Sequence, residues 1–254
     1  MSSNYFTQEE ELWLKCRRGR FTASEIHKIF IKGKRDMTED ELEARPKGPR
    51  GGLLDRRTTI ETLFGDGAIT YIRTKLTEIT TVSEDPDFLG FGEAKQLKWG
   101  RDHEFLAADE FVRVTGKQLL YHGNVCPKFI EYGEFAGGSP DGEVLNEDAI
   151  LEIKCPFNTD IHTQRLFLKT IQEFKESHFP EYCQCQMNME VTGKNYCYFA
   201  SYDPRRINPK LRMKIVKIPR DQEWVDEFKM RLEQALIILS ELLAGWEENE
   251  MIIE

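Results

Sequence analysis

The sequence lacks any long apolar run. No stretch approaches the roughly 20 apolar residues that a membrane-spanning helix needs, and the first residues have neither the basic start nor the apolar stretch of a secretory signal. We therefore expect an intracellular protein. With 254 residues, of which 40% are hydrophobic, the chain can bury a substantial core, and we expect one domain over residues 1–254.

Paired cysteines are also missing. Six cysteines are spread along the chain without a C-x-x-C pair, which argues against a zinc ribbon and against a disulfide framework. The closest pair, Cys183 and Cys185, is predicted to be buried inside a helix. The histidines show no H-E-x-x-H spacing and no G-x-x-x-x-G-K-[S/T] motif is present, so neither that type of metalloprotease nor an ATP-driven motor is indicated.

Positive charge is in the minority. There are 35 Lys and Arg against 44 Asp and Glu, a formal net charge of -9, which argues against a surface coated in positive charge. A nuclease can confine its positive potential to a channel, however, so local clusters matter more. Arg17–Arg20 is a basic turn before a predicted helix, and residues 32–52 are expected to form a flexible basic loop. Solvated surface charge is the alternative explanation for both.

Apolar periodicity predicts helices near both ends of the chain and strands between them. The expected helices cover 7–30, as two short helices broken at Gly19, and then 54–64, 93–115, 160–175, 180–191 and 221–246. The expected strands cover 118–122, 129–132, 135–137, 149–154, 196–202 and 214–218. This order predicts an α/β fold with a central mixed β-sheet flanked by helices.

Charged residues occur in an unusual place, inside the apolar run 149–154. Asp141 stands at a turn before this run, and Glu152 follows eleven residues later (152 minus 141). Because side chains two apart on a strand share a face, Glu152 and Lys154 should point to one side and Ile153 to the other. Unpaired charge in a core is costly, so these residues need a reason to be there.

Two explanations fit this pattern. A structural salt bridge between Glu152 and Lys154 is the simpler one. The functional one is that Asp141 and Glu152 hold one or two Mg²⁺ ions through oxygen, with the carbonyl of Ile153 as a further ligand. The ammonium group of Lys154 would then lie beside a water that attacks a phosphodiester. This second explanation predicts a metal-dependent DNA nuclease.

Several motifs together resemble those of the lambda exonuclease family, the YqaJ-like viral recombinase nucleases of the PD-(D/E)XK superfamily. The motifs occur in order from about residue 12 to about residue 245, and jointly they are specific. They are Arg17–Ser24, Trp99–Glu104, Ser139–Gly142 followed by Leu151–Phe157, Cys183–Thr192 and Tyr198–Arg205. The resemblance implies a restriction-endonuclease-like (PD-(D/E)XK) fold.

The resemblance also implies roles at the catalytic centre. Asp141 and Glu152 would be metal ligands, and Glu104 would be an acidic residue beside the metals. Lys154 would orient the nucleophile, and Gln184 would assist at the same site. Mg²⁺ is the implied cofactor, with two ions per site and Mn²⁺ as a substitute.

Further positions match the family's contacts with the DNA end. Arg17, Ser24 and Ser139 match residues that hold the 5′-terminal phosphate, and Gln186 lies in the family's glutamine-bearing helix as a DNA-binding candidate. Leu97 falls where the family has an apolar wedge that splays the duplex.

The chain also departs from the family in two places. Asp160 stands where the family has a phosphate-binding arginine, and Arg165 is the next arginine along the chain. This leaves the preference for a 5′-phosphate open. The segment 32–91 matches poorly, so loop contacts with DNA cannot be transferred from the family.

The expected function is Mg²⁺-dependent, processive 5′–3′ digestion of one strand of linear double-stranded DNA to mononucleotides, which leaves a 3′ single strand for viral recombination. The resemblance implies a ring-shaped homotrimer around DNA ends and a single-strand annealing protein as partner. Three alternatives stay open: an endonuclease on the same fold, a nuclease with an iron–sulfur cluster, and an inactive DNA-end-binding scaffold.

Overall fold

The structure is a computed structural model that describes residues 8–47, 49, 54, 57–82, 95–122 and 128–247. The chain forms two compact units. Unit 1 consists of Met1–His27 and Lys75–Glu227, and unit 2 of Lys28–Thr74 and Phe228–Glu254. Among the described residues, no helix is both long and apolar enough to cross a membrane.

The helices and strands have the following bounds. The α-helices are α1 (Gln8–Arg17), α2 (Glu39–Glu43), α3 (Asp66–Thr80), α4 (Lys95–Thr115), α5 (Thr159–Leu166), α6 (Ile171–Ser177), α7 (Phe179–Thr192) and α8 (Gln222–Glu247), with 3₁₀ helices η1 (Ile26–Phe30) and η3 (Pro209–Leu211). The strands are β1 (Phe21–Thr22), β2 (Gly33–Asp36), β3 (Thr59–Thr62), β4 (Leu119–His122), β5 (Ile130–Tyr132), β6 (Ala136–Gly138), β7 (Gly142–Val144), β8 (Ala149–Lys154), β9 (Tyr196–Tyr202) and β10 (Met213–Pro219).

Unit 1 is built around a mixed sheet with the strand order β10-β9-β8-β7-β4. β8 and β9 are parallel, with Glu152 opposite Phe199, whereas the other neighbours are antiparallel. A smaller sheet, β1-β6-β5, lies in the same unit. The predicted mixed sheet is therefore confirmed.

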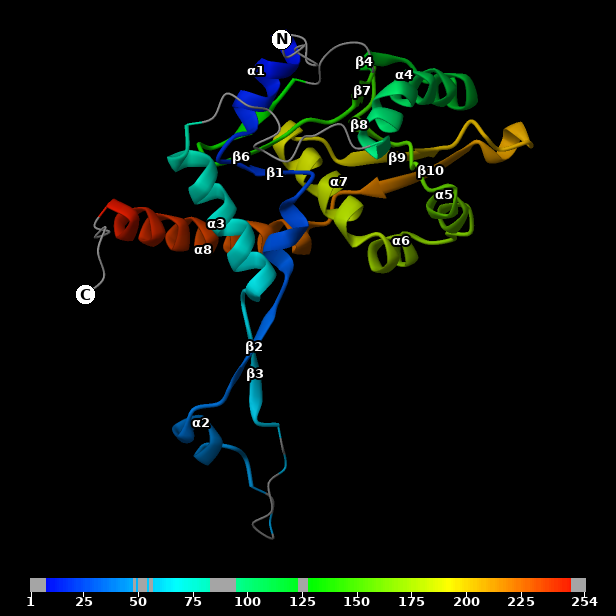
Figure 1. Cartoon of the computed structure of the whole chain (residues 1–254). Coiled ribbons are helices and arrows are strands. Elements are labelled where there is room, and N and C mark those ends of the chain that lie inside the picture. Colours follow the sequence, from blue (N-terminus) through cyan, green and yellow to red (C-terminus); the bar gives the residue numbers. More distant parts are fainter. Residues whose placement is uncertain are drawn as a thin grey trace. The chain divides into compact units, whose positions relative to one another are not determined.

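Helices cover both faces of the main sheet, with α4 on one side and α7 on the other (Figure 1). Phe111 of α4 packs in a core cluster with Leu151 and Ile153 of β8. The alternate residue Glu152 faces α7 instead, since its carboxylate accepts a hydrogen bond from that helix. α7 ends at Gly193, whose φ of 68° closes the helix in the left-handed conformation that glycine tolerates best.

Unit 2 contains a two-stranded ribbon in place of the expected loop. β2 pairs antiparallel with β3, from Gly33 opposite Thr62 to Asp36 opposite Thr59, and α2 lies at the far end of the ribbon from α3 (Figure 1). Residues 48, 50–53 and 55–56 lie outside the described residues. The helix expected over 54–64 is wrong, because the alternating β-branched residues of β3 pair with β2.

Other expected elements differ in detail. The helix expected over 160–175 is two helices, because Thr170 caps a new helix by accepting a hydrogen bond from the amide of Glu173. The second helix expected before residue 30 is the 3₁₀ helix η1, and α3 and β7 were not expected. The helices expected over 93–115, 180–191 and 221–246 are confirmed as α4, α7 and α8.

Candidate active site

The charged pair in β8 lies where the sequence predicted it. Glu152 is fully buried, and its Oε1 accepts a hydrogen bond of 2.6 Å from Nζ of Lys154, whose side chain is 32% exposed. Ile153 packs in the core on the opposite face of the strand. The strand therefore delivers a carboxylate and an ammonium group to the same side, with the ammonium closer to solvent.

Asp141 is fastened to the same strand. Its backbone N–H donates to the carbonyl of Leu151 at 3.0 Å, and its Oδ2 accepts from the backbone N–H of Ile153 at 2.6 Å. β7 pairs with β8 only at Gly142 and Glu143, so the side chain of Asp141 serves the amide of Ile153 beyond the end of that pairing. Asp141 and Glu152 thus converge from the turn after β6 and from β8.

A third carboxylate, Glu104 on α4, adds to the negative charge. Burial, followed by the charges of Glu152 and Glu104, raises the pKa of Asp141 well above its ordinary value. Burial and the charge of Glu152 also raise the pKa of Glu104. Burial acts to lower the pKa of Lys154, but the carboxylates of Glu152 and Asp141 outweigh it and raise that pKa. One ammonium group thus faces three carboxylates, an excess that a cation would relieve.

The donor set fits a hard divalent cation. Asp141 and Glu152 offer carboxylate oxygens, the ligands that Mg²⁺ prefers, and the raised pKa values of Asp141 and Glu104 show how poorly the protein alone compensates their charges. No group of three or more His, Cys, Asp and Glu side chains that could hold a metal occurs within the described part of the chain. An ion at this position would therefore need further ligands from backbone, water or substrate.

Helix α7 supplies a contact that the sequence did not indicate. Nδ2 of the fully buried Asn188 donates to Oε2 of Glu152 at 2.9 Å. Gln184 lies four residues earlier, so it shares this helix face, and it is half-buried. The prediction that Gln184 assists at the site is compatible with this placement but remains a prediction.

Gln186 does not belong to the site. It is fully buried, its Nε2 donates to the carbonyl of Pro219, and its Oε1 accepts from the backbone N–H of Asp221. Both ends of its amide thus join α7 to the segment between β10 and α8. We correct the expectation that Gln186 contacts DNA, because its side chain is fully buried and both ends of its amide are hydrogen-bonded within the protein.

The three residues expected to bind phosphate are linked. Nη2 of Arg17 donates to Oγ of Ser24 at 2.9 Å, and its guanidinium lies 4.3 Å from the ring centre of Trp13. Nε1 of Trp13 donates to Oγ of Ser139 at 3.0 Å. Trp13 therefore connects Arg17 to Ser139, two residues before Asp141, which the sequence did not reveal.

The structure has an aspartate, Asp160, at the position where the family was expected to have a phosphate-binding arginine. Asp160 is exposed in the first turn of α5, where its Oδ2 accepts a hydrogen bond from the side chain of Gln164. Arg165 is 3% exposed and donates to Glu181 at 2.5 Å. Neither residue supplies a guanidinium group at the surface for a phosphate.

Comparison with known proteins identifies the family. Residues 57–195, which are 139 of the 254 residues, match the YqaJ-like viral recombinase domain. The chain belongs to this family. No curated protein matches the chain in sequence.

Solved structures confirm the fold of this YqaJ-like domain. It is similar to an alkaline exonuclease (LHK-Exo) from Laribacter hongkongensis, with a TM-score of 0.66 and 20% identity over 94% of this chain and 96% of the other. The same exonuclease in complex with dAMP gives a TM-score of 0.67 at the same identity and coverage. A phage related exonuclease from Haemophilus somnus 129PT gives 0.60 and 18% identity over 89% and 96% of the two chains. At these identities the likeness establishes the PD-(D/E)XK fold.

Two residues that follow β9, Asp203 and Arg205, hold the chain after Lys154 in place. Arg205 donates to the carbonyls of Pro156 and Phe157, and its guanidinium lies 4.4 Å from the ring centre of Trp99. Asp203, which is fully buried, accepts from both the backbone and the side chain of Arg205. Leu97, the expected wedge, is 51% exposed in the first turn of α4.

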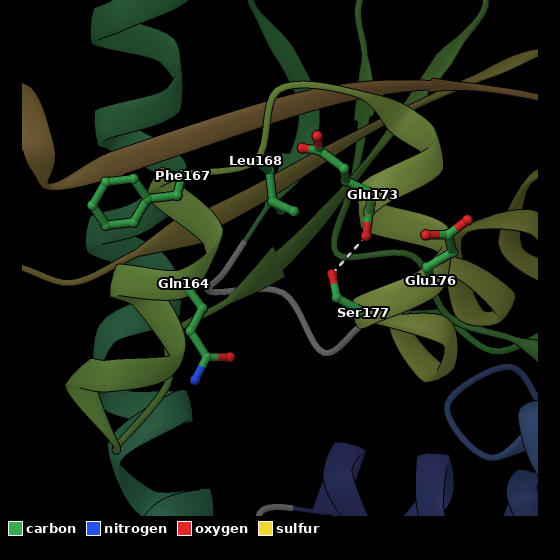
Figure 2. A pocket seen from close by; sticks show the side chains of 6 residues that line it. All are labelled: Gln164, Phe167, Leu168, Glu173, Glu176 and Ser177. Atoms are coloured by element: carbon green, nitrogen blue, oxygen red, sulfur yellow. Dashed lines mark hydrogen bonds between the residues drawn. The ribbon is translucent and has the colours of Figure 1, made fainter.

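A pocket of about 430 Å³ lies between α5 and α6 (Figure 2). None of the candidate active-site residues lines it. Its polar groups serve the helices: the carboxylate of Glu173 accepts from the backbone N–H of Lys169, and Oγ of Ser177 donates to the carbonyl of Glu173. We assign it no role in the chemistry.

Proposed function

We propose that this YqaJ-like domain is a Mg²⁺-dependent exodeoxyribonuclease that degrades one strand of linear duplex DNA to mononucleotides. The main support is that Asp141, Glu152 and Lys154 converge at β8, beside the charge of Glu104. The family is that of viral recombinases, and two solved proteins of the same fold are exonucleases. The 3′ single strand left by digestion would serve recombination.

Asp141 and Glu152 would hold Mg²⁺ or Mn²⁺, and the carbonyl of Ile153 and the carboxylate of Glu104 would be further ligands. We propose two ions per site. When bound, the ions would supply positive charge to the reacting phosphate and favour the hydroxide form of water. The carboxylates are already directed by the backbone N–H of Ile153 and by Lys154.

Lys154 orients the nucleophile in this proposal. One of its three N–H groups donates to Oε1 of Glu152, which leaves two for the nucleophile or for a phosphate oxygen. The Lys154 side chain is 32% exposed whereas that of Glu152 is fully buried, so Lys154 is the member of the pair that a substrate would meet first. Gln184 is proposed to hydrogen-bond the same substrate region from α7.

We also propose that digestion starts at the 5′ end. Arg17, Ser24 and Ser139 would hold a terminal 5′-phosphate. Trp13 contacts both Arg17 and Ser139 and so fixes their positions relative to each other. Leu97 would part the two strands at the duplex end. Of the other arginines in the basic turn, Arg18 donates to the carbonyl of Glu78, so it serves the protein itself.

We further propose that the domain acts processively as a ring-shaped homotrimer around DNA and works with a single-strand annealing protein. A ring would allow a chain of net charge -9 to bind DNA, since basic residues could line the channel while acidic ones face solvent. Sedimentation of the purified protein should then give three times the 29.7 kDa mass of one chain. A monomer at working concentration would contradict the ring.

The proposal is tested with linear duplex DNA labelled at the 5′ or the 3′ end, with and without a 5′-phosphate, and with covalently closed circular DNA. In Mg²⁺, 5′ label should be released early as mononucleotide, 3′ label late, and the circle should stay intact. Early 3′ release would reverse the polarity. A cut circle would indicate an endonuclease, and end binding without any release would indicate an inactive scaffold.

A further inference from the structure

A buried amide stands behind the proposed metal ligands. Asn188 is fully buried in α7, and its Nδ2 donates to Oε2 of Glu152 at 2.9 Å. The other oxygen of this carboxylate, Oε1, accepts from Lys154 at 2.6 Å. Each oxygen of the Glu152 carboxylate thus accepts from a donor on a different element, and together the two donors fix the plane of the carboxylate.

The direction of the Asn188 amide follows from charge. If the amide were turned over, its Oδ1 would face the carboxylate of Glu152, and two acceptors would meet in a buried place. With Nδ2 toward Glu152, Oδ1 is buried and has no hydrogen-bond partner among the residues the structure describes. Leaving a buried acceptor unpaired carries a cost, so the contact with Glu152 determines the orientation.

Gly138 makes room for this arrangement. A Cβ atom added to Gly138 would lie 2.3 Å from Oδ1 of Asn188, which would have to move, and 3.2 Å from Cβ of Ala23 and Cγ2 of Val191, which would have to give by a few tenths of an ångström. Gly138 ends β6, three residues before Asp141 (141 minus 138), and its backbone needs no positive φ. Asn188 therefore lies against both segments that carry the carboxylates, β8 and the end of β6.

Without Asn188, nothing described would hold Oε2 of Glu152 away from Lys154. Lys154 already pairs with Oε1 of Glu152, and a carboxylate can offer an ammonium group both of its oxygens, so Oε2 would be free to turn toward Lys154 as well. We propose that Asn188 is a positioning residue that keeps Glu152 directed for metal binding. This inference rests on the proposed function in one respect, that Glu152 is a metal ligand.

The test compares Asn188→Leu with Gln186→Met, in which a buried amide of the same helix is replaced by an apolar side chain of similar size. Metal affinity is measured without DNA, by the Mg²⁺ concentration at which Tm rises and by Mn²⁺ binding in electron paramagnetic resonance. Both variants should have a lower Tm without metal, because Asn188→Leu loses one buried hydrogen bond and Gln186→Met loses two. Only Asn188→Leu should bind metal about tenfold or more weakly, as changes behind a ligand commonly do.

Gly138→Ala provides a second, independent test that also serves if Asn188→Leu does not fold. Its Cβ should displace the amide of Asn188 and weaken Mn²⁺ binding although neither Asn188 nor Glu152 is changed. Adding Asn188→Ser, whose shorter side chain leaves space for this Cβ, should weaken binding no further, which a double-mutant cycle detects.

The outcomes separate the two proposals. Unchanged metal affinity in Asn188→Leu or in Gly138→Ala, beside a wild type that binds metal, would overturn the positioning role alone. Equal loss in Gln186→Met would overturn it as well, because the effect would then be general loosening of α7. A wild type that binds no metal would overturn both this role and the proposed nuclease.

Discussion

Asp203→Asn removes the charge that holds Arg205 against the chain after Lys154. Burial alone would raise the pKa of Asp203, but hydrogen bonds from Arg205 and Thr159 outweigh it and lower that pKa from 3.8 to about 2. A lowering of this size corresponds to about 2 kcal/mol of folding free energy at neutral pH. Asn has nearly the same shape as Asp, so the loss should come from charge rather than from packing.

The sign of the pH dependence follows from the direction of the shift. A carboxyl group whose pKa is lowered on folding stabilises the protein above its unfolded pKa, near 4, and this contribution is lost as the pH falls toward about 2. Urea unfolding of the wild type and of Asp203→Asn should therefore differ by about 2 kcal/mol at pH 7 and progressively less between pH 4 and pH 2. A difference that is absent at pH 7, or that stays constant down to pH 2.5, would show that the charge of Asp203 does not stabilise the fold.

Three further changes have expected outcomes. Gln186→Met should lower the free energy of unfolding by about 1 to 3 kcal/mol, because it removes two buried hydrogen bonds, and should leave the digestion rate per folded molecule unchanged. Phe111→Ala should cost about 3 to 5 kcal/mol in urea unfolding, since it empties a fully buried site between α4 and β8. Arg17→Ala should raise KM about tenfold or more for ends with a 5′-phosphate and little for 5′-hydroxyl ends; an equal rise for both would remove Arg17 from phosphate recognition.

The arrangement at β8 was predictable because it depends on local periodicity. Glu152 and Lys154 are two residues apart, so any strand there places them on one face, and Ile153 on the other. The contact of Asn188 with Glu152 joins residues 36 apart in the sequence, and no local pattern marks it. Such a contact needs the packing of α7 on the sheet, which the sequence alone does not specify.

The elements that the sequence analysis missed, α3 and the β2–β3 ribbon, also depend on contacts that local patterns do not show. The α3 helix was overlooked although Ala68, Tyr71 and Ile72 are buried at helical spacing, because the next position in this pattern, Lys75, is charged and yet only 2% exposed. The β2–β3 ribbon was overlooked for another reason. Its strands contain few apolar residues and are defined by pairing with each other across more than 20 residues.

The roles of Asp141 and Lys154 are tested by Mg²⁺-dependent release of mononucleotides from linear duplex DNA by the wild type, Asp141→Asn, Lys154→Met and the control Gln186→Met. We expect digestion by the wild type and by Gln186→Met, no detectable digestion by Asp141→Asn or Lys154→Met, and folded protein in every case. Digestion by Asp141→Asn at the wild-type rate would contradict the proposed role of Asp141.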